Sequence, residues 1–150
     1  MQYKSVQALN EFSFADAAIA SIAYFGGSLT LELDNVTILA NNSHNRDIHD
    51  MRANNVILTF TEATLLKVVA EGYKVYDANN QLKETIDDTI ISPDDYAAFF
   101  KERENNTIYS IASSNDTHCI ISIDSEYETY LIEADYSQSI VEWDRFLKKE

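Results

Sequence analysis

Hydrophobic and polar residues alternate along several stretches of the chain, which predicts a fold built mainly of β-strands. Leu29, Leu31 and Leu33 are separated by Thr30 and Glu32, and this two-residue period is typical of a strand with one buried face. Short segments rich in β-branched and aromatic residues continue the pattern. We expect further strands in the segments 36–39, 56–60, 65–70, 73–76, 81–91, 107–112, 118–123 and 126–134.

Two segments carry the spacing of a helix. Ser92 suits an N-cap, Pro93 suits the first turn, and the two aspartates that follow favour the positive end of a helix dipole, which predicts a helix over 93–104. A closing helix is predicted to begin at Ser139. Its shared face would consist of Ile140, Trp143 and Leu147, with Phe146 beside them and Lys148 and Lys149 at its negative end.

Residues 14–24 are ambiguous, because two patterns overlap there. The run from Ser13 to Asp16 resembles a capping box, and Gly26-Gly27 would end a helix. The same residues also alternate in a way that a strand tolerates, with Ala17 and Ile19 on one side. We favour the helix for this segment.

Together these elements predict one α+β domain over residues 1–150. Roughly eight strands in hairpin order, with two or three short helices, indicate a predominantly antiparallel β-sheet that is sandwich- or half-barrel-like. Asp34-Asn35 is expected to turn the first hairpin, between the strands at 29–33 and 36–39. The length of 150 residues is that of a single domain.

The chain is strongly acidic, and its charge is unevenly distributed. The formal net charge is −14. Between Glu84 and Asp144 there are fifteen acids and two bases, a net charge of −13, which leaves −1 for the rest. Such a chain lacks the cationic surface that nucleic acids and anionic membranes require, so we expect neither as a partner. A basic protein is the expected partner instead.

The sequence also indicates the cellular compartment of the protein. No secretory signal and no apolar run long enough for a membrane helix is evident, and Cys119 has no second cysteine with which to pair. We therefore expect a cytoplasmic protein that does not associate with membranes. No phosphate loop, dinucleotide fingerprint or nucleophile elbow is present, so no cofactor is expected. The oligomeric state is left open.

The segment 41–52 holds two of the three histidines and is a candidate site. His44 and His49, with Asp47 or Asp50, are possible metal ligands, and His49 beside Asp50 is a possible general base. The spacing matches no established zinc motif, so we favour a solvated polar loop over a metal site or a general base here. A third reading is contact with a partner. The residues of that contact would be His44, Arg46, Asp47 and His49.

Two further groups of residues are candidate sites. His118 and Cys119 are neighbours, but in a strand they point to opposite faces, so we expect Cys119 in the core rather than in a catalytic dyad. Asp124, Glu126 and Glu128 would share one face of a regular strand, with tyrosines among them. Such a row fits a docking strip for a cationic partner, a solvated face or a cation site. The candidate partner-binding residues are Asp124, Glu126, Tyr127, Glu128 and Tyr130.

In overall character the chain resembles the immunity proteins of bacterial contact-dependent inhibition and related polymorphic toxin systems. These are small, acidic, cytosolic single-domain proteins without a catalytic signature. The resemblance implies a non-enzymatic protein that occludes the active site of a cationic, nuclease-like toxin with an acidic surface. Two other hypotheses stay open: a small-ligand or metal-dependent enzyme using the His44/His49 loop, and a structural subunit of an assembly.

Overall fold

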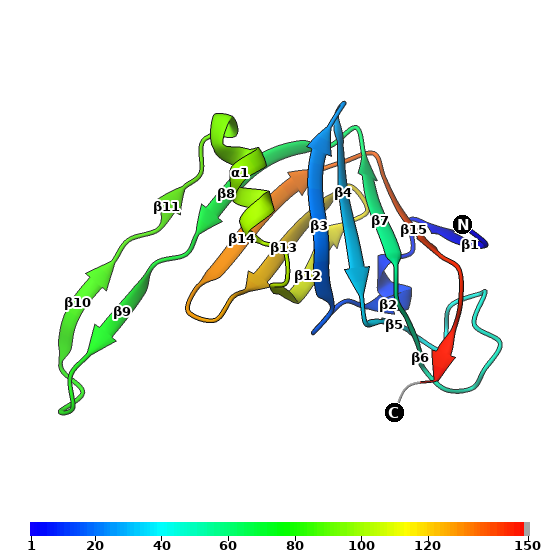
Figure 1. Cartoon of the computed structure of the whole chain (residues 1–150), viewed down its shortest axis with the longest axis horizontal. Coiled ribbons are helices and arrows are strands. Elements are labelled where there is room, and N and C mark those ends of the chain that lie inside the picture. The colour runs from blue at the N-terminus through cyan, green and yellow to red at the C-terminus, as the bar shows by residue number, and fades with distance from the viewer. Residues whose placement is uncertain (149–150) are drawn as a thin grey trace.

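A computed structural model describes residues 1–148, and β-strands dominate it (Figure 1). One α-helix, α1 (Tyr96–Glu102), and two 3-10 turns, η1 (Leu9–Glu11) and η2 (Pro93–Asp95), are the helical elements of this part of the chain. The strands are β1 (Tyr3–Val6), β2 (Phe12–Ser13), β3 (Ala18–Phe25), β4 (Ser28–Asp34), β5 (Val36–Ile38), β6 (Met51–Ala53), β7 (Val56–Thr61), β8 (Thr64–Ala70), β9 (Tyr73–Tyr76), β10 (Leu82–Ile86), β11 (Thr89–Ile90), β12 (Thr107–Asn115), β13 (His118–Asp124), β14 (Thr129–Asp135), β15 (Gln138–Trp143) and β16 (Leu147–Lys148).

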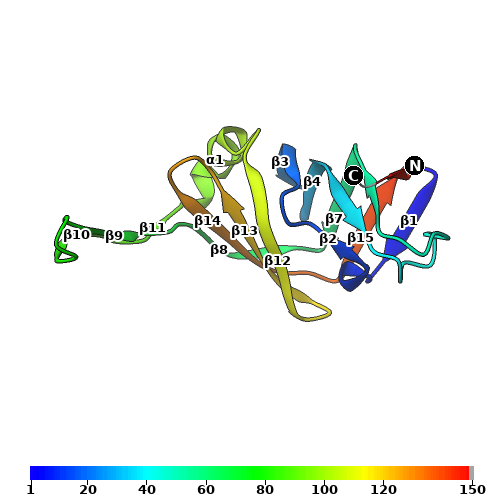
Figure 2. The same ribbon diagram turned by 90° about the horizontal axis from the view of Figure 1, so that it is seen from below.

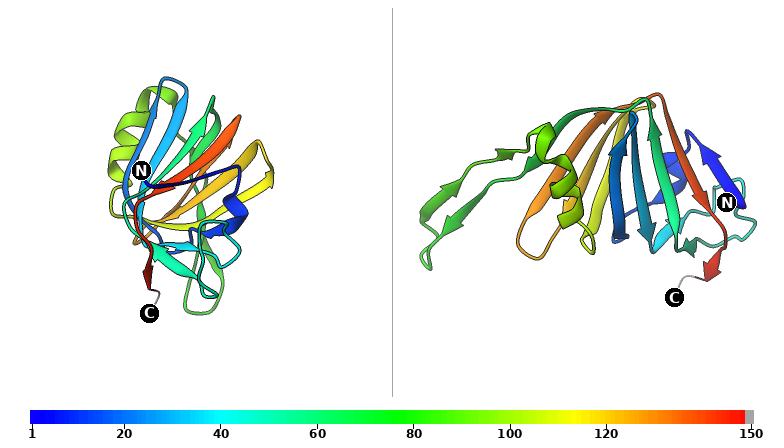
Figure 3. Two further views of the ribbon diagram at one scale, coloured as in Figure 1. Left: turned by 90° about the vertical axis from the view of Figure 1, so that its right-hand side faces the viewer. Right: turned by 45° about the horizontal axis from the view of Figure 1, so that its top comes forward.

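Ten of these strands form one antiparallel sheet in the order β1-β15-β7-β4-β3-β12-β13-β14-β8-β11. Two long, bent segments hold it together. Residues 56–70 comprise β7 and β8 and bend at Glu62, whose φ is 47°, while residues 129–143 comprise β14 and β15 and bend at Tyr136. The two segments pair with each other on both sides of their bends, β7 with β15 and β8 with β14. The bends make the sheet curve strongly, as Figure 3 shows.

The curved sheet encloses a single hydrophobic core. Leu31 and Leu58 from one half of the sheet and Ile121 and Ile132 from the other half are fully buried in the same cluster. Trp143, on β15, is also fully buried and stacks on Tyr3 with ring centroids 5.6 Å apart. Because every second residue of the central strands faces this core, the alternation in the sequence becomes one continuous apolar interior.

The helix α1 covers the place where the two halves of the sheet separate. Strands β3 and β12 are paired only near Ala18 and Thr107 and then diverge. The helix contacts β3, and its Phe99 packs edge-to-face on Tyr130 of β14 at 5.4 Å. The helix α1 therefore packs against both β3 and β14, and Figure 1 shows it lying over this side of the sheet.

Two small sheets complete the fold. A four-stranded sheet, in the order β16-β6-β5-β2, adds Phe12, Ile38 and Ala53 to the core. A two-stranded ribbon of β9 and β10 projects away from the body, as Figures 1 and 2 show. None of the residues 71–90 is buried, so this arm contributes nothing to the main core.

The helix predicted over 14–24 is wrong, because these residues lead into strand β3. A β-bulge between Ile19 and Ser21 explains the error. The bulge adds one residue to the strand, so that Ile19 and Ile22 both face the core at a separation of three. A separation of three is also the spacing of a helix face, and only the pairing of β3 with β4 distinguishes the two.

The closing helix predicted from Ser139 is also wrong. Residues 138–143 form β15 between β1 and β7, with Ser139, Val141 and Trp143 buried and Ile140 on the other face. The helical spacing of Ile140 and Trp143 is therefore incidental. Lys149, which was assigned to the end of this helix, lies outside the described residues.

The first hairpin turns at Gly26-Gly27 between β3 and β4, and not at Asp34-Asn35 as predicted. Strand β5 leaves β4 and pairs with β2 and β6 in the small sheet. The segment 81–91 divides into β10, which pairs with β9, and β11, which pairs with β8 in the large sheet. The remaining strand predictions match β-strands within a few residues, and the helix predicted over 93–104 is confirmed as η2 followed by α1. The antiparallel class is confirmed, but one α-helix replaces the two or three that were expected.

Candidate functional site

Three segments that are distant in the sequence meet where the arm leaves the body. The Glu71 amide donates to the Thr129 carbonyl oxygen at 2.9 Å, which ties the start of the arm to the turn between β13 and β14. The Gly72 amide donates to Asp88 Oδ1 at 2.6 Å, which ties the two strands of the arm together. The backbone therefore fixes the relative positions of all three segments.

Acidic and aromatic side chains gather around this junction. Glu71, Tyr73, Tyr127 and Glu128 line one shallow hollow, and Tyr73, Asp87 and Asp88 line a second one beside it. Tyr127 is 84% exposed and Tyr73 is 51% exposed. We call this group the acidic surface. Its members are Glu71, Tyr73, Asp87, Asp88, Asp124, Glu126, Tyr127 and Glu128.

The carboxylates of the acidic surface have no ion-pair partner within residues 1–148. The ion pairs of that part of the chain are Lys101–Glu104 and Arg103–Glu102. His118 and Glu133 are joined by a hydrogen bond away from this surface. Lys74 is the one basic residue that lines either hollow, against the four acids Glu71, Asp87, Asp88 and Glu128. The field of these carboxylates is consequently directed at solvent, where it attracts cationic groups over roughly a Debye length, about 8–10 Å.

The proposed row Asp124, Glu126 and Glu128 lies in a turn and not on a strand face. Strand β13 ends at Asp124 and β14 begins at Thr129, so residues 125–128 make the connection. The turn is held by Ser125, whose hydroxyl donates to the Glu128 carbonyl at 3.0 Å and accepts from the Glu128 amide at 3.1 Å. The side chains of Glu126, Tyr127 and Glu128 are exposed at its tip.

Tyr130 differs from the other four candidate partner-binding residues. It is 8% exposed and belongs to the core. The Arg103 guanidinium lies 3.7 Å from the centroid of its ring, and the Phe99 ring packs on it as well. Its role in the described structure is to pack α1 against the sheet.

Gly72 sets the close approach of the two strands at the base of the arm. A Cβ atom at this position would collide with the Ile86 carbonyl oxygen and with the backbone of Asp87 and Asp88. Only glycine therefore permits the hydrogen bond to Asp88 without a shift of the backbone. The distance between Glu71 and the pair Asp87 and Asp88 therefore depends on Gly72.

The His44–His49 loop is organised by two buried asparagines. Asn45 Nδ2 donates to the carbonyl oxygens of Ile38, Leu39 and His49, each at 3.2 Å. Asn42 Nδ2 donates to Ser5 Oγ at 3.2 Å. The asparagine side chains of this loop therefore stabilise its own conformation, because buried amide groups need hydrogen-bond partners.

The two histidines of the loop have different surroundings. The His44 ring packs against Tyr3 and Trp143, and its Nε2 lies 2.9 Å from the Lys4 carbonyl oxygen. His49 is exposed, as are Arg46 and Asp47. Within residues 1–148 no group of three or more His, Cys, Asp or Glu side chains is arranged to hold a metal ion. A hollow lined by His44, Arg46 and Asp47 remains open to solvent.

Cys119 is fully buried, and burial raises the pKa of its thiol to about 12. His118 points to the opposite face of β13, where its ring contacts Glu133. The expected separation of these two neighbours is confirmed, and a thiol held protonated in the core is not a nucleophile.

The sequence indicated part of the acidic surface and missed the rest. Glu126 and Glu128 were identified from their alternation in the chain, and Tyr127 as an aromatic residue among them. Glu71 and Tyr73 were missed because a single acid beside a strand gives no signal by itself. Asp87 and Asp88 were missed as well, because they fall inside the predicted strand segment 81–91, whereas in the structure they lie between β10 and β11.

None of the helices within residues 1–148 has the length and apolar character needed to cross a membrane. No family model matches this chain, and no curated protein and no solved structure is significantly similar to it.

Proposed function

We propose that this chain is a protein-binding module that recognises a basic partner protein through the acidic surface by contact alone, without catalysis at that surface. The observation that carries this proposal is the meeting of three acidic segments around two exposed tyrosines, with no ion pair to their carboxylates within residues 1–148. Unpaired carboxylates accelerate the encounter with a cationic surface, and exposed aromatic side chains supply contact area once it has docked.

The kind of partner follows from the charge and from the resemblance stated above. A nuclease-like toxin has a cationic active site because it binds phosphates. An acidic surface that covers such a site would block its substrate, which is the action of an immunity protein. The His44, Arg46, Asp47 and His49 loop is a second, smaller contact in this proposal.

A photo-crosslinking residue placed at Tyr127 tests the location of the contact. The matched control is the same substitution at Tyr109, which is 64% exposed and lies on β12 outside the acidic surface. In cells of the source organism we expect the Tyr127 probe to capture one basic protein that the Tyr109 probe does not. Equal capture by both probes, or capture of acidic proteins only, would contradict the proposal.

Charge reversal then tests the mechanism with the captured partner. We expect Glu126→Lys with Glu128→Lys to slow association about tenfold at low salt, and to reduce the salt dependence, because long-range attraction is lost. Glu11→Lys with Glu142→Lys changes the net charge equally at positions outside the acidic surface. If both pairs of substitutions have the same effect, net charge and not this surface governs binding.

A further inference from the structure

Ser114, His118 and Glu133 form a hydrogen-bonded relay on the outer face of the sheet. Ser114 Oγ lies 3.0 Å from His118 Nδ1, and His118 Nε2 lies 2.8 Å from Glu133 Oε2. The three residues come from the adjacent strands β12, β13 and β14. A hydroxyl, an imidazole and a carboxylate in this order are the parts of an activated nucleophile.

The chemistry of the three groups fixes the direction of the hydrogen bonds. An ionised carboxylate can only accept, so Glu133 requires the proton of the neutral imidazole to be on Nε2. Nδ1 then carries a lone pair and is an acceptor. The Ser114 hydroxyl, 3.0 Å away, is the group that donates to it. The imidazole is therefore poised to take the hydroxyl proton.

The surroundings hold the relay in place and leave the hydroxyl accessible. The turn between β12 and β13 is short and braced, since Asn115 Oδ1 accepts from both the amide and the hydroxyl of Thr117. The His118 side chain is 20% exposed and that of Glu133 is 33% exposed, so both are partly shielded from water. Ser114 itself is exposed.

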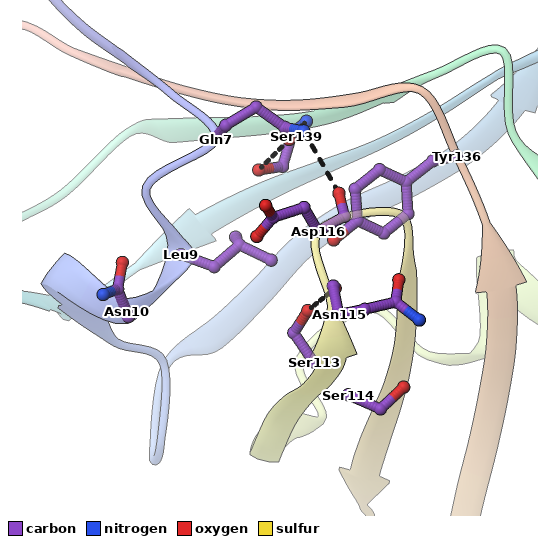
Figure 4. Close-up of a pocket in the computed structure, with 9 residues that line it drawn as sticks. All are labelled: Gln7, Leu9, Asn10, Ser113, Ser114, Asn115, Asp116, Tyr136 and Ser139. Atoms are coloured by element: carbon purple, nitrogen blue, oxygen red, sulfur yellow. Dashed lines mark hydrogen bonds between the residues drawn. The ribbon is translucent and has the colours of Figure 1, made fainter.

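Ser113 provides an internal comparison, because its hydroxyl is differently engaged. It donates to the carbonyl oxygens of Asn115 and His118, and not to an imidazole. Figure 4 shows both serines in the wall of a polar hollow that Gln7 and Asp116 also line. Of the two neighbouring serines, Ser114 is therefore the one whose hydroxyl lies beside an imidazole.

We propose that Ser114 is a nucleophile that accepts acyl groups from small esters. In this step the Ser114 Oγ–carbonyl carbon bond forms and the ester bond to the leaving alcohol breaks. The hydroxyl proton passes to His118 Nδ1 and from there to the departing oxygen. Glu133 is a positioning residue, which holds the imidazole in the required tautomer and stabilises its protonated form.

The test uses p-nitrophenyl acetate with the full chain. We expect release of p-nitrophenolate together with one acetyl group on Ser114, located by peptide mass spectrometry. Ser114→Ala should abolish this adduct, and Ser113→Ala should leave its rate unchanged. His118→Gln should slow acetylation about 100-fold, the lower end of what general-base catalysis supplies. The denatured chain gives the background rate of an ordinary serine.

Two measurements separate a chemical role from a structural one. Free imidazole should restore acetylation in His118→Ala, which a variant damaged only in its packing would not show. For Glu133→Gln, the ring-nitrogen NMR shifts of His118 should reveal the other tautomer while the melting temperature stays near that of the wild type. Acetylation of Ser114 at the background rate, or at an unchanged rate in His118→Gln, would overturn the proposal.

Discussion

The two ends of the β13–β14 strand pair carry opposite arrangements of similar side chains. At one end, Glu126 and Glu128 stand in an exposed turn without ion-pair partners in the described chain. At the other end, Glu133 is bound to His118, which is bound in turn to Ser114. The ends are about 20 Å apart, the length of a seven-residue strand.

This difference shows how the same chemical group serves two purposes on one pair of strands. A carboxylate without a partner acts over a distance and attracts charge. A carboxylate that accepts a hydrogen bond at 2.8 Å acts only on the group it touches, here the His118 ring. The first arrangement suits recognition of another protein, and the second suits proton transfer.

The largest expected effect on stability comes from a substitution in the middle of the β13–β14 pair, because both ends of the pair depend on its packing. Ile121 is fully buried, and Ile121→Ala removes methyl groups from a packed core. We expect a loss of about 2–5 kcal/mol in the free energy of unfolding, measured by urea denaturation. Ser122→Ala, on the other face of β13, is the control. A cost below that of the control would mean that the core is not continuous there.

A smaller and local effect is expected at the base of the arm. Gly72→Ala forces the backbone apart, and we expect the arm amides to open more easily by about 1–3 kcal/mol in hydrogen exchange. Global stability and Ser114 acetylation should be unchanged, because nothing in residues 71–90 is buried. Loss of Ser114 acetylation in Gly72→Ala would show that the two ends of the β13–β14 pair are coupled.

The smallest expected effect is that of the turn acids on stability. Glu126 is exposed and has no ion-pair partner in residues 1–148, so Glu126→Lys should change the free energy of unfolding by less than about 0.5 kcal/mol. The same denaturation experiment measures it. A clear stabilisation by lysine would indicate that the surface acids repel one another strongly within the folded chain.

Local signals in the sequence predicted those elements whose pattern has one interpretation. The helix that starts after Ser92 was predicted because capping and dipole effects act within one turn. Strand β7 was predicted because its alternation is regular, with Val56, Leu58 and Phe60 facing the core. In both cases the information lies within the segment itself.

Predictions failed where a neighbour in space chose between two local patterns. Ile19 and Ile22 have helical spacing, and the bulge against β4 makes them strand residues. Ile140 and Trp143 have the same spacing, but β1 and β7 on either side require a strand there. The residues of a short segment do not show which strands will pair with it in the folded protein.

The sequence by itself determined the antiparallel β-rich class, the helix at 93–104, the burial of Cys119 and the concentration of acid between 84 and 144. Only the tertiary structure decided which acids share a surface, since Glu71 reaches Glu128 through a pairing of segments more than fifty residues apart. It also decided that Ser114, His118 and Glu133 meet. The physical reason is that hydrogen bonds between strands act across space, whereas periodicity and capping act along the chain.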